Sequence, residues 1–137
     1  WKGQIYAIEK KEDALALLKE NRRKFATDNL EIVSGTAPEA MVELPVPTHA
    51  FIGGSSGNMN EIIRLLLDKN PGVRIVINCI TLETVTEAMN AIRDFSLTDV
   101  DIVQLSAARS KSIGRYHMMM GENPIYIISC SGRGEEI

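Results

Sequence analysis

The sequence predicts an α/β fold in which a mostly parallel sheet is covered by helices. Short apolar runs alternate with stretches of helical periodicity along most of the chain. This alternation is typical of parallel strands joined by crossover helices, because a tight turn cannot link parallel neighbours. The predicted strands are residues 4–8, 30–33, 49–52, 74–79, 100–105 and 125–130.

Helix signals lie between most of these strands. Glu12 and Asp13 are acidic residues that favour the first turn of a helix after strand 4–8. Thr36 and Glu39 have the spacing of a capping box, with Pro38 in the first turn, so a second helix is predicted there.

Two further helices are predicted downstream. Asn58 precedes an amphipathic stretch that Asn70-Pro71-Gly72 ends, and a fourth helix begins near Thr81. No helical pattern occupies the connection 106–123, so the last two strands are predicted to be antiparallel neighbours.

Composition narrows the class of protein. The chain has 137 residues and 45% apolar content, enough for the core of one domain. Its formal charge of −3 argues against nucleic-acid binding through a broad basic face. No run reaches the ~18 apolar residues of a membrane span, and no paired metal-ligand spacing occurs, so we predict a cytoplasmic protein without a metal site. Cys79 and Cys130 lie in apolar strands and are interpreted as buried thiols.

A candidate ligand site lies where two predicted strands end. The segment Ser34-Gly35-Thr36-Ala37 follows strand 30–33, and Glu9 follows strand 4–8. Ligands bind at the carboxyl edge of α/β sheets, where loops converge and backbone N–H groups at helix starts are unpaired. A carboxylate at that edge is suited to accept hydrogen bonds from the two hydroxyls of a ribose.

A hydrolase is an alternative prediction. The run Gly53-Gly54-Ser55-Ser56-Gly57 matches G-x-S-x-G between a strand and a helix, and an aspartate (Asp94 or Asp101) and then His117 follow in hydrolase order. The chain is short for that fold and lacks an HGGG-type oxyanion segment. The match therefore leaves Ser55 as a candidate nucleophile that is less favoured than the nucleoside site.

Several motifs together carry a resemblance over nearly the whole chain. They are Tyr6-Ala7-Ile8-Glu9-Lys10, Ser34-Gly35-Thr36-Ala37-Pro38-Glu39-Ala40, Phe51-Ile52-Gly53-Gly54-Ser55-Ser56-Gly57, and Ser106-Ala107-Ala108-Arg109 with Asn123-Pro124-Ile125-Tyr126. In this order they resemble the decarboxylating precorrin methyltransferases of cobalamin biosynthesis that act at C15, alone or fused to a C5-methylating domain. These are class I S-adenosylmethionine-dependent enzymes, and the resemblance implies a Rossmann-like sheet with helices on both faces and an antiparallel last strand.

The resemblance implies roles for particular residues. Glu9 would bind the ribose hydroxyls and the backbone of Ala37 would meet the adenine. Gly35 and Thr36 are the other cofactor-binding residues that the resemblance implies, although Thr36 stands where the family usually has aspartate. Gly53 and Gly54 would line the substrate side. Methyl transfer needs no nucleophilic side chain, so no catalytic residue is assigned.

A precorrin substrate carries several carboxylates, and the connection 106–123 holds cations that could bind them. These cations are Arg109, Lys111 and Arg115. The alternative is an ordinary solvated basic connection. The family further implies a homo-oligomer, often a tetramer.

The resemblance also implies a partial domain. Class I methyltransferases begin with a strand and a glycine-rich loop that holds the methionine end of the cofactor, whereas this chain aligns from the second strand onward. We therefore expect residues 1–137 to be one truncated methyltransferase domain, with unpaired edges on strands 4–8 and 49–52. A non-catalytic, oligomerising fragment of such an enzyme is a further alternative.

Overall fold

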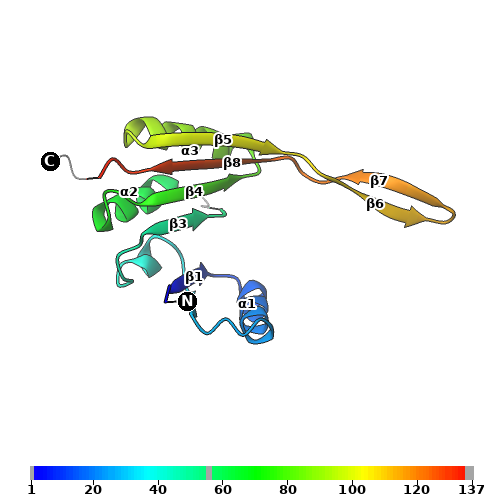
Figure 1. Ribbon diagram of the computed structural model, residues 1–137, viewed down its shortest axis with the longest axis horizontal. Helices are drawn as coiled ribbons and strands as arrows, with labels where there is room; N and C mark the ends of the chain where they lie inside the picture. The colour runs from blue at the N-terminus through cyan, green and yellow to red at the C-terminus, as the bar shows by residue number, and fades with distance from the viewer. Residues whose placement is uncertain (1, 55–56, 135–137) are drawn as a thin grey trace. The chain divides into compact units, whose positions relative to one another are not determined.

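The computed structural model describes residues 2–54 and 57–134, so Ser55 lies outside the described residues. The chain divides into two compact units, unit 1 (Trp1–Pro45) and unit 2 (Val46–Ile137). Each unit has a sheet of its own, as Figure 1 shows. The α/β class predicted from the alternation of strands and helices is confirmed. In the described part of the chain, no helix is long and apolar enough to cross a membrane.

Unit 1 is built around a strand–helix–strand motif. β1 (Ile5–Glu9) and β2 (Leu30–Ser34) are parallel, with a register that runs from Ile5 opposite Leu30 to Glu9 opposite Ser34. Helix α1 (Glu12–Lys24) connects them. Its first turn is acidic and its last turn is basic, which complements the helix dipole at both ends.

The helix predicted from Thr36 and Glu39 is wrong. Only a single 3₁₀ turn, η1 (Glu39–Met41), forms there, and its N-cap is Pro38 rather than Thr36. Two prolines, Pro45 and Pro47, follow closely. Proline cannot donate a backbone hydrogen bond and disfavours helical backbone at the residue before it, so a helix begun at this turn could not continue past Glu43.

Unit 2 holds a four-stranded sheet in the order β3–β4–β8–β5. β3 (His49–Ile52) and β4 (Arg74–Cys79) are parallel, with α2 (Met59–Lys69) between them in the chain. After α3 (Leu82–Asp94) come β5 (Thr98–Leu105) and β8 (Ile125–Ser131), and β8 is antiparallel to both of its neighbours. The antiparallel last pair predicted from the missing helix is therefore confirmed.

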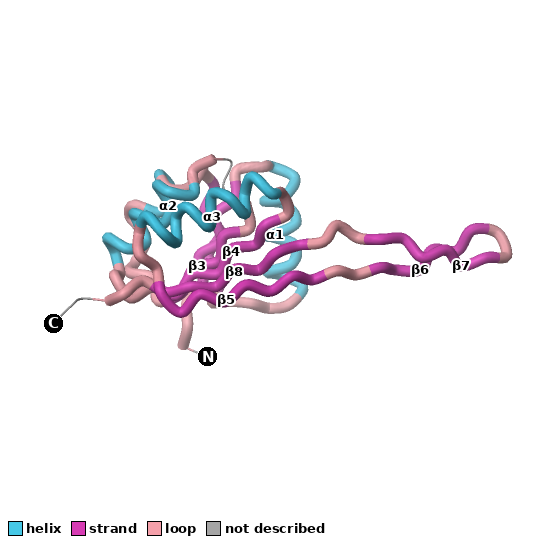
Figure 2. The backbone as a smooth tube through the Cα atoms, turned by 90° about the horizontal axis from the view of Figure 1, so that it is seen from above, coloured by secondary structure: helices cyan, strands magenta, loops and turns pink. Residues whose placement is uncertain are grey.

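The core of unit 2 lies between the sheet and its two helices, which cover the same face (Figure 2). Alternate residues of β4 point to that face, and Ile75, Ile77 and Cys79 are fully buried. Ile128 opposes Ile77, and Cys130 opposes Ile75, from β8. Both cysteines are buried and free, as predicted.

The connection 106–123 is a β-hairpin, which the sequence analysis did not predict. β6 (Ala108–Ile113) and β7 (Tyr116–Gly121) pair antiparallel around Gly114 and Arg115. Gly114 has a φ of 58°, and glycine at the first position of a two-residue loop is typical of a type II′ hairpin. We call residues 106–121 the arm. Every residue of the arm is exposed, and Figure 2 shows it projecting away from the sheet.

β1 and β3 each have an edge without a partner among the described residues, as β2 and β5 have at the other ends of their sheets. β1 pairs only with β2 in unit 1, and β3 pairs only with β4 in unit 2. Each of these edges presents backbone N–H and C=O groups that could pair with a further strand.

Candidate functional site

Glu9 is the acidic residue at the end of β1, and its carboxylate is fixed by the backbone. Oε1 accepts hydrogen bonds from the backbone N–H groups of Lys10, at 2.9 Å, and Lys11, at 3.0 Å. The bond from Lys11, followed by the bond from Lys10, lowers the pKa of Glu9 below its ordinary value, because both donors stabilise the ionised form. Glu9 is therefore a preoriented anion near neutral pH.

The segment after β2 lies next to Glu9. The backbone N–H of Gly35 donates to the carbonyl of Glu9 at 3.0 Å, which extends the strand ladder by one bond. Gly35 has a φ of 152°, and a Cβ there would lie 3.0 Å from the Cβ of Ala40. A larger residue would thus crowd the turn, and Thr36 and Ala37 directly follow it. The structure brings Glu9, Gly35, Thr36 and Ala37 to one edge of unit 1.

This edge is chemically suited to a nucleoside. Oε1 of Glu9 is engaged with backbone donors, and no described residue is hydrogen-bonded to Oε2. An ionised carboxylate with a free oxygen can accept bonds from neighbouring hydroxyls, such as those of a ribose. The backbone of the 35–37 turn adds polar groups with small side chains, which lets a flat base approach closely.

Gly53 and Gly54 follow β3 in unit 2, at the carboxyl edge of the four-stranded sheet. Among the described residues, a Cβ at Gly54 would meet nothing within 4 Å, whereas one at Gly53 would lie 3.2 Å from Cε1 of Phe51. The turn is thus open on the side of Gly54. Because Ile52 pairs with Ile77, Gly53 follows alongside Asn78 of β4.

Asn78 is a residue that the sequence analysis missed. Its Oδ1 is buried and has no hydrogen-bond partner among residues 2–54 and 57–134. An unpaired buried acceptor costs about 1–3 kcal/mol, so its presence beside the Gly53 turn calls for a reason. The sequence feature that could have pointed to Asn78 is its position as the one amide side chain inside the otherwise apolar run Ile75-Val76-Ile77-Asn78-Cys79.

The predicted substrate cations lie on the arm rather than beside Gly53 and Gly54. Arg109 and Lys111 are in β6, opposite Met120 and Met118, and Arg115 is in the turn at the tip. All three are exposed. The structure groups these cations with one another but separates them from the glycine turn of the same chain.

The alternative hydrolase residues are not assembled. His117 lies on the arm opposite Ser112, whereas Asp101 lies in the sheet opposite Ser129. Asp94, at the end of α3, is 3.8 Å from Nε of Arg93. The described residues therefore contain no aspartate–histidine pair that could activate a nucleophile.

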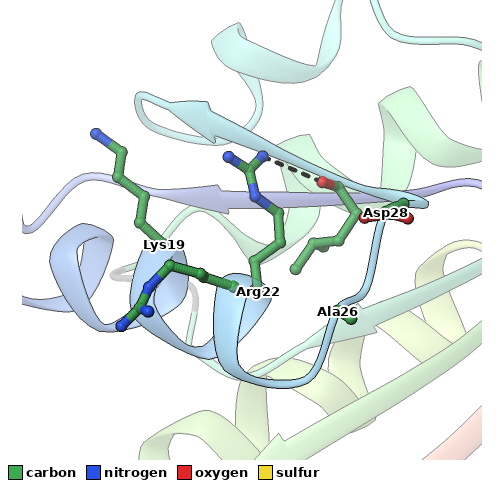
Figure 3. Close-up of a pocket in the computed structure, with 6 residues that line it drawn as sticks. Lys19, Arg22, Ala26 and Asp28 are labelled. Atoms are coloured by element: carbon green, nitrogen blue, oxygen red, sulfur yellow. Dashed lines mark hydrogen bonds between the residues drawn. The ribbon is translucent and has the colours of Figure 1, made fainter.

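A shallow basic hollow lies on unit 1 (Figure 3). Arg22 crosses it and donates from Nη1 to the carbonyl of Leu30 at 3.4 Å. Lys19, Arg23, Ala26 and Asp28 complete its lining. Leu30 begins β2 while Gly35 follows its end, so the hollow and the Glu9 edge lie at opposite ends of the strand.

Comparison with known proteins shows which family the chain resembles. Residues 2–131 match the precorrin methyltransferase domain family. The chain belongs to this family. A curated relative from Methanothermobacter thermautotrophicus, named as a probable cobalt-precorrin-6B C(15)-methyltransferase (decarboxylating), is 38% identical over 127 residues, covering 91% of this chain and 66% of the relative. The corresponding protein of Salmonella typhimurium is 33% identical and covers 93% and 66%, respectively. The chain thus spans just under two thirds of the length of these curated relatives.

Solved structures of precorrin enzymes have the same fold. A precorrin-6Y C5,15-methyltransferase from Geobacter metallireducens matches with a TM-score of 0.84 and 34% identity, over 94% of this chain and 68% of that one. A precorrin 8w decarboxylase from Methanobacterium thermoautotrophicum matches with a TM-score of 0.82 and 37% identity, over 93% and 69%. A more distant S-adenosylmethionine-dependent O-methyltransferase from Thermotoga maritima, 18% identical with a TM-score of 0.71, shares the fold. The predicted family and the class I methyltransferase fold are confirmed.

Proposed function

We propose that this chain is part of one methyltransferase domain that methylates a cobalt-precorrin at C15 and removes a carboxyl group from an acetate side chain, in cobalamin biosynthesis. The family match over residues 2–131 and the names of the curated relatives support this reaction. The structural observation that supports the proposal is the edge of unit 1, where the ionised carboxylate of Glu9 lies beside the Gly35 turn.

S-adenosylmethionine is the proposed cofactor, and the unit 1 edge fits its nucleoside end. Its sulfonium supplies the methyl group, so the protein mainly aligns the reactants. Oε2 of Glu9 would accept bonds from the ribose hydroxyls, while Oε1 stays bonded to Lys10 and Lys11 and keeps the carboxylate oriented. The backbone at Thr36 and Ala37 would contact the adenine.

The substrate side would be formed by the turn after β3. Gly53 and Gly54 have no side chains, and a Cβ at Gly54 would meet nothing within 4 Å among the described residues. A flat macrocycle could therefore approach the backbone closely there. Its carboxylates call for cationic donors, for which Arg109, Lys111 and Arg115 are the proposed residues.

We further propose that the protein is a homo-oligomer that works in the cytoplasm. The exposed apolar side chains of the arm support the first point, because a projecting two-stranded hairpin is marginally stable unless it packs against something. The free buried thiols of Cys79 and Cys130 support the second, because such thiols are usual in a reducing compartment.

Calorimetric titration with S-adenosylhomocysteine tests the cofactor site. The titration is made on this chain, on Glu9→Ala and on Glu20→Ala, which removes an exposed carboxylate from α1. Loss of hydrogen bonds to a charged group costs about 1.5–3 kcal/mol, so we expect Glu9→Ala to bind roughly 10- to 100-fold more weakly. Glu20→Ala should bind like the parent chain.

The Methanothermobacter relative is the positive control for the assay. If that relative binds S-adenosylhomocysteine and this folded chain does not, the proposal that this chain itself holds the cofactor is wrong. Equal affinities of the parent chain and Glu9→Ala would remove the assigned role of Glu9.

A further inference from the structure

Two large apolar side chains are exposed where β4 is connected to α3. Ile80 follows the last residue of β4 and is 57% exposed, and Leu82, the first residue of α3, is 72% exposed. Thr81 lies between them as the N-cap of the helix. We call Ile80 and Leu82 the apolar pair.

The apolar pair lies at the edge of the four-stranded sheet where Gly53 and Gly54 follow β3. Because Ile52 is opposite Ile77 in parallel register, the turn after β3 begins alongside Asn78, two residues before Ile80. Figure 1 shows β3, β4 and β5 ending on the same side of this sheet. The connections after β3 and β4 therefore leave the sheet side by side, at the candidate substrate edge.

Packing of α3 against the sheet does not account for Leu82. The side of α3 that faces the core carries Ala88 and Ala91, which are buried, whereas Leu82 shares the opposite side with the exposed residues Thr86 and Met89. A polar residue in place of Leu82 would leave the core intact. Since Cα–Cβ bonds tilt toward the N-terminus of a helix, the side chain of Leu82 is directed toward the edge at which α3 begins.

Hydrogen bonds fix the backbone that carries the apolar pair. The hydroxyl of Thr81 accepts from the backbone N–H of Thr84 at 3.1 Å, and the backbone N–H of Val85 donates to the carbonyl of Thr81 at 3.1 Å. Oγ1 of Thr86 donates to the carbonyl of Leu82 at 2.9 Å. A preorganised connection of this kind loses little conformational freedom when a ligand covers it, which favours binding.

The described residues of this edge are uncharged. No lysine, arginine, aspartate or glutamate occurs in the segments 52–54, 78–82, 105–107 and 123–126. Leu105, at the end of β5, adds another apolar side chain that is 49% exposed. Glu83 directly follows Leu82 and disfavours a carboxylate beside it. The edge therefore suits the apolar body of a macrocycle rather than the carboxylates at its rim.

We propose that Ile80 and Leu82 form an apolar wall of the substrate site and contact the ring body of the tetrapyrrole held at Gly53 and Gly54. The inference rests on the proposed function for the class of substrate, and it adds two substrate-contacting residues to that site. Contact between the ring and these side chains releases water from both surfaces, so the wall supplies affinity that does not depend on charge.

Fluorescence titration with uroporphyrin, a tetrapyrrole with carboxylates on all of its side chains, tests the wall. The wall variants are Leu82→Gln and the double variant Ile80→Asn with Leu82→Gln. Leu82→Met keeps an apolar side chain of similar size. The matched control is Leu17→Gln, the same change at a leucine of α1 that is 59% exposed.

We expect Leu82→Gln to bind uroporphyrin about 10-fold more weakly than the parent chain, and the double variant to bind more weakly still, because each loses apolar contact with the ring. Leu82→Met and Leu17→Gln should bind like the parent chain. The loss in Leu82→Gln should persist at ~1 M salt, which screens charge interactions but not apolar contact. Urea unfolding should give all variants the stability of the parent chain, since the replaced side chains are exposed.

The inference is wrong if Leu82→Gln binds like Leu17→Gln, if Leu82→Met binds as weakly as Leu82→Gln, or if the loss in Leu82→Gln disappears at high salt. Absence of uroporphyrin binding by the parent chain would also overturn it. A parallel titration of the parent chain with S-adenosylhomocysteine separates the two proposals, because binding of S-adenosylhomocysteine alone would leave the methyltransferase function standing without the wall.

Discussion

The four-stranded sheet of unit 2 and the arm that leaves it use similar strands for opposite purposes. β4 and β8 alternate buried and half-buried residues, and their buried positions pack beneath α2 and α3. β6 and β7 have the same length range and also contain apolar residues, yet every one of their residues is exposed. The comparison shows that strand formation alone does not decide burial: a strand is buried where helices cover it, and the arm has no such cover within the described part of this chain.

The largest expected difference in stability between sheet and arm is for the replacement of an isoleucine by alanine. Ile77 is fully buried between β3 and β8, whereas Ile113 near the tip of the arm is 46% exposed. Ile77→Ala should lower the free energy of unfolding by about 2–5 kcal/mol, because it removes buried methyl groups and leaves a cavity. Ile113→Ala should change it by no more than ~0.5 kcal/mol. Urea unfolding followed by circular dichroism measures both; equal losses would contradict the division between sheet and arm.

The next largest difference in stability is expected for the replacement of a glycine by alanine. A Cβ at Gly132, just after β8, would collide with the backbone oxygen of Pro71 and lie 2.7 Å from Cδ2 of Leu67, while one at Gly121 on the arm would meet nothing within 4 Å. Gly132→Ala should therefore destabilise the fold by about 1–3 kcal/mol, since the loop after α2 must move. Gly121→Ala is the control. A thermal midpoint for Gly132→Ala that matches the control would show that this loop yields without cost.

The last comparison is between two asparagines of unit 2, one with a hydrogen-bonded side chain and one with a buried, unpaired oxygen among the described residues. Asn70 uses both ends of its amide, donating to the carbonyl of Pro47 at 2.8 Å and accepting from the N–H of Gly72 at 3.0 Å. Oδ1 of Asn78 is buried and has no hydrogen-bond partner in the described part of the chain. Asn70→Leu should cost roughly 1–3 kcal/mol, whereas Asn78→Leu should leave stability unchanged or raise it.

The functional meaning of Asn78 follows from the same pair of variants. If Asn78→Leu is at least as stable as the parent chain but binds S-adenosylhomocysteine or a carboxylated porphyrin more weakly, the amide is retained for a ligand. A loss of stability as large as that of Asn70→Leu would instead show that Asn78 has a structural role in the folded sheet.

Much of the fold follows from local sequence signals. The strands His49–Ile52 and Arg74–Cys79 were predicted at their observed bounds, because they are apolar runs closed by turn residues on both sides. Thr81 was predicted to begin α3, and its hydroxyl accepts the capping bond from the N–H of Thr84 at 3.1 Å. These signals need no information from distant parts of the chain.

The errors came from features that local signals do not settle. The spacing of Thr36 and Glu39 predicted a capped helix, but the 3₁₀ turn that forms has Pro38 as its N-cap and no side-chain cap, and Pro45 and Pro47 follow it closely. The arm was missed because Gly114-Arg115 is a weaker hairpin signal than Asn-Gly and because Met118-Met119-Met120 does not alternate with polar residues.

One part of the candidate site could be predicted from the sequence and another could not. Glu9 and the Gly35 turn end adjacent parallel strands, so the order of elements alone places them together. The position of Arg109 and Lys111 depends instead on how far a hairpin projects, which the residues of a connection do not reveal. Asn78 stands out because its buried Oδ1 has no hydrogen-bond partner among the residues that the structure describes, and that can be seen only in three dimensions.

The position of β8 between β4 and β5 bears on how the protein is made. These two strands share no ladder of their own, so each depends on residues 125–131 for its pairing on that side. On the ribosome, β4 and β5 emerge well before β8 and wait with an open edge until it arrives. The two strands of the arm, in contrast, pair through a two-residue turn. The part of unit 2 that is exposed in the finished chain can therefore be formed first, while the buried sheet is completed last.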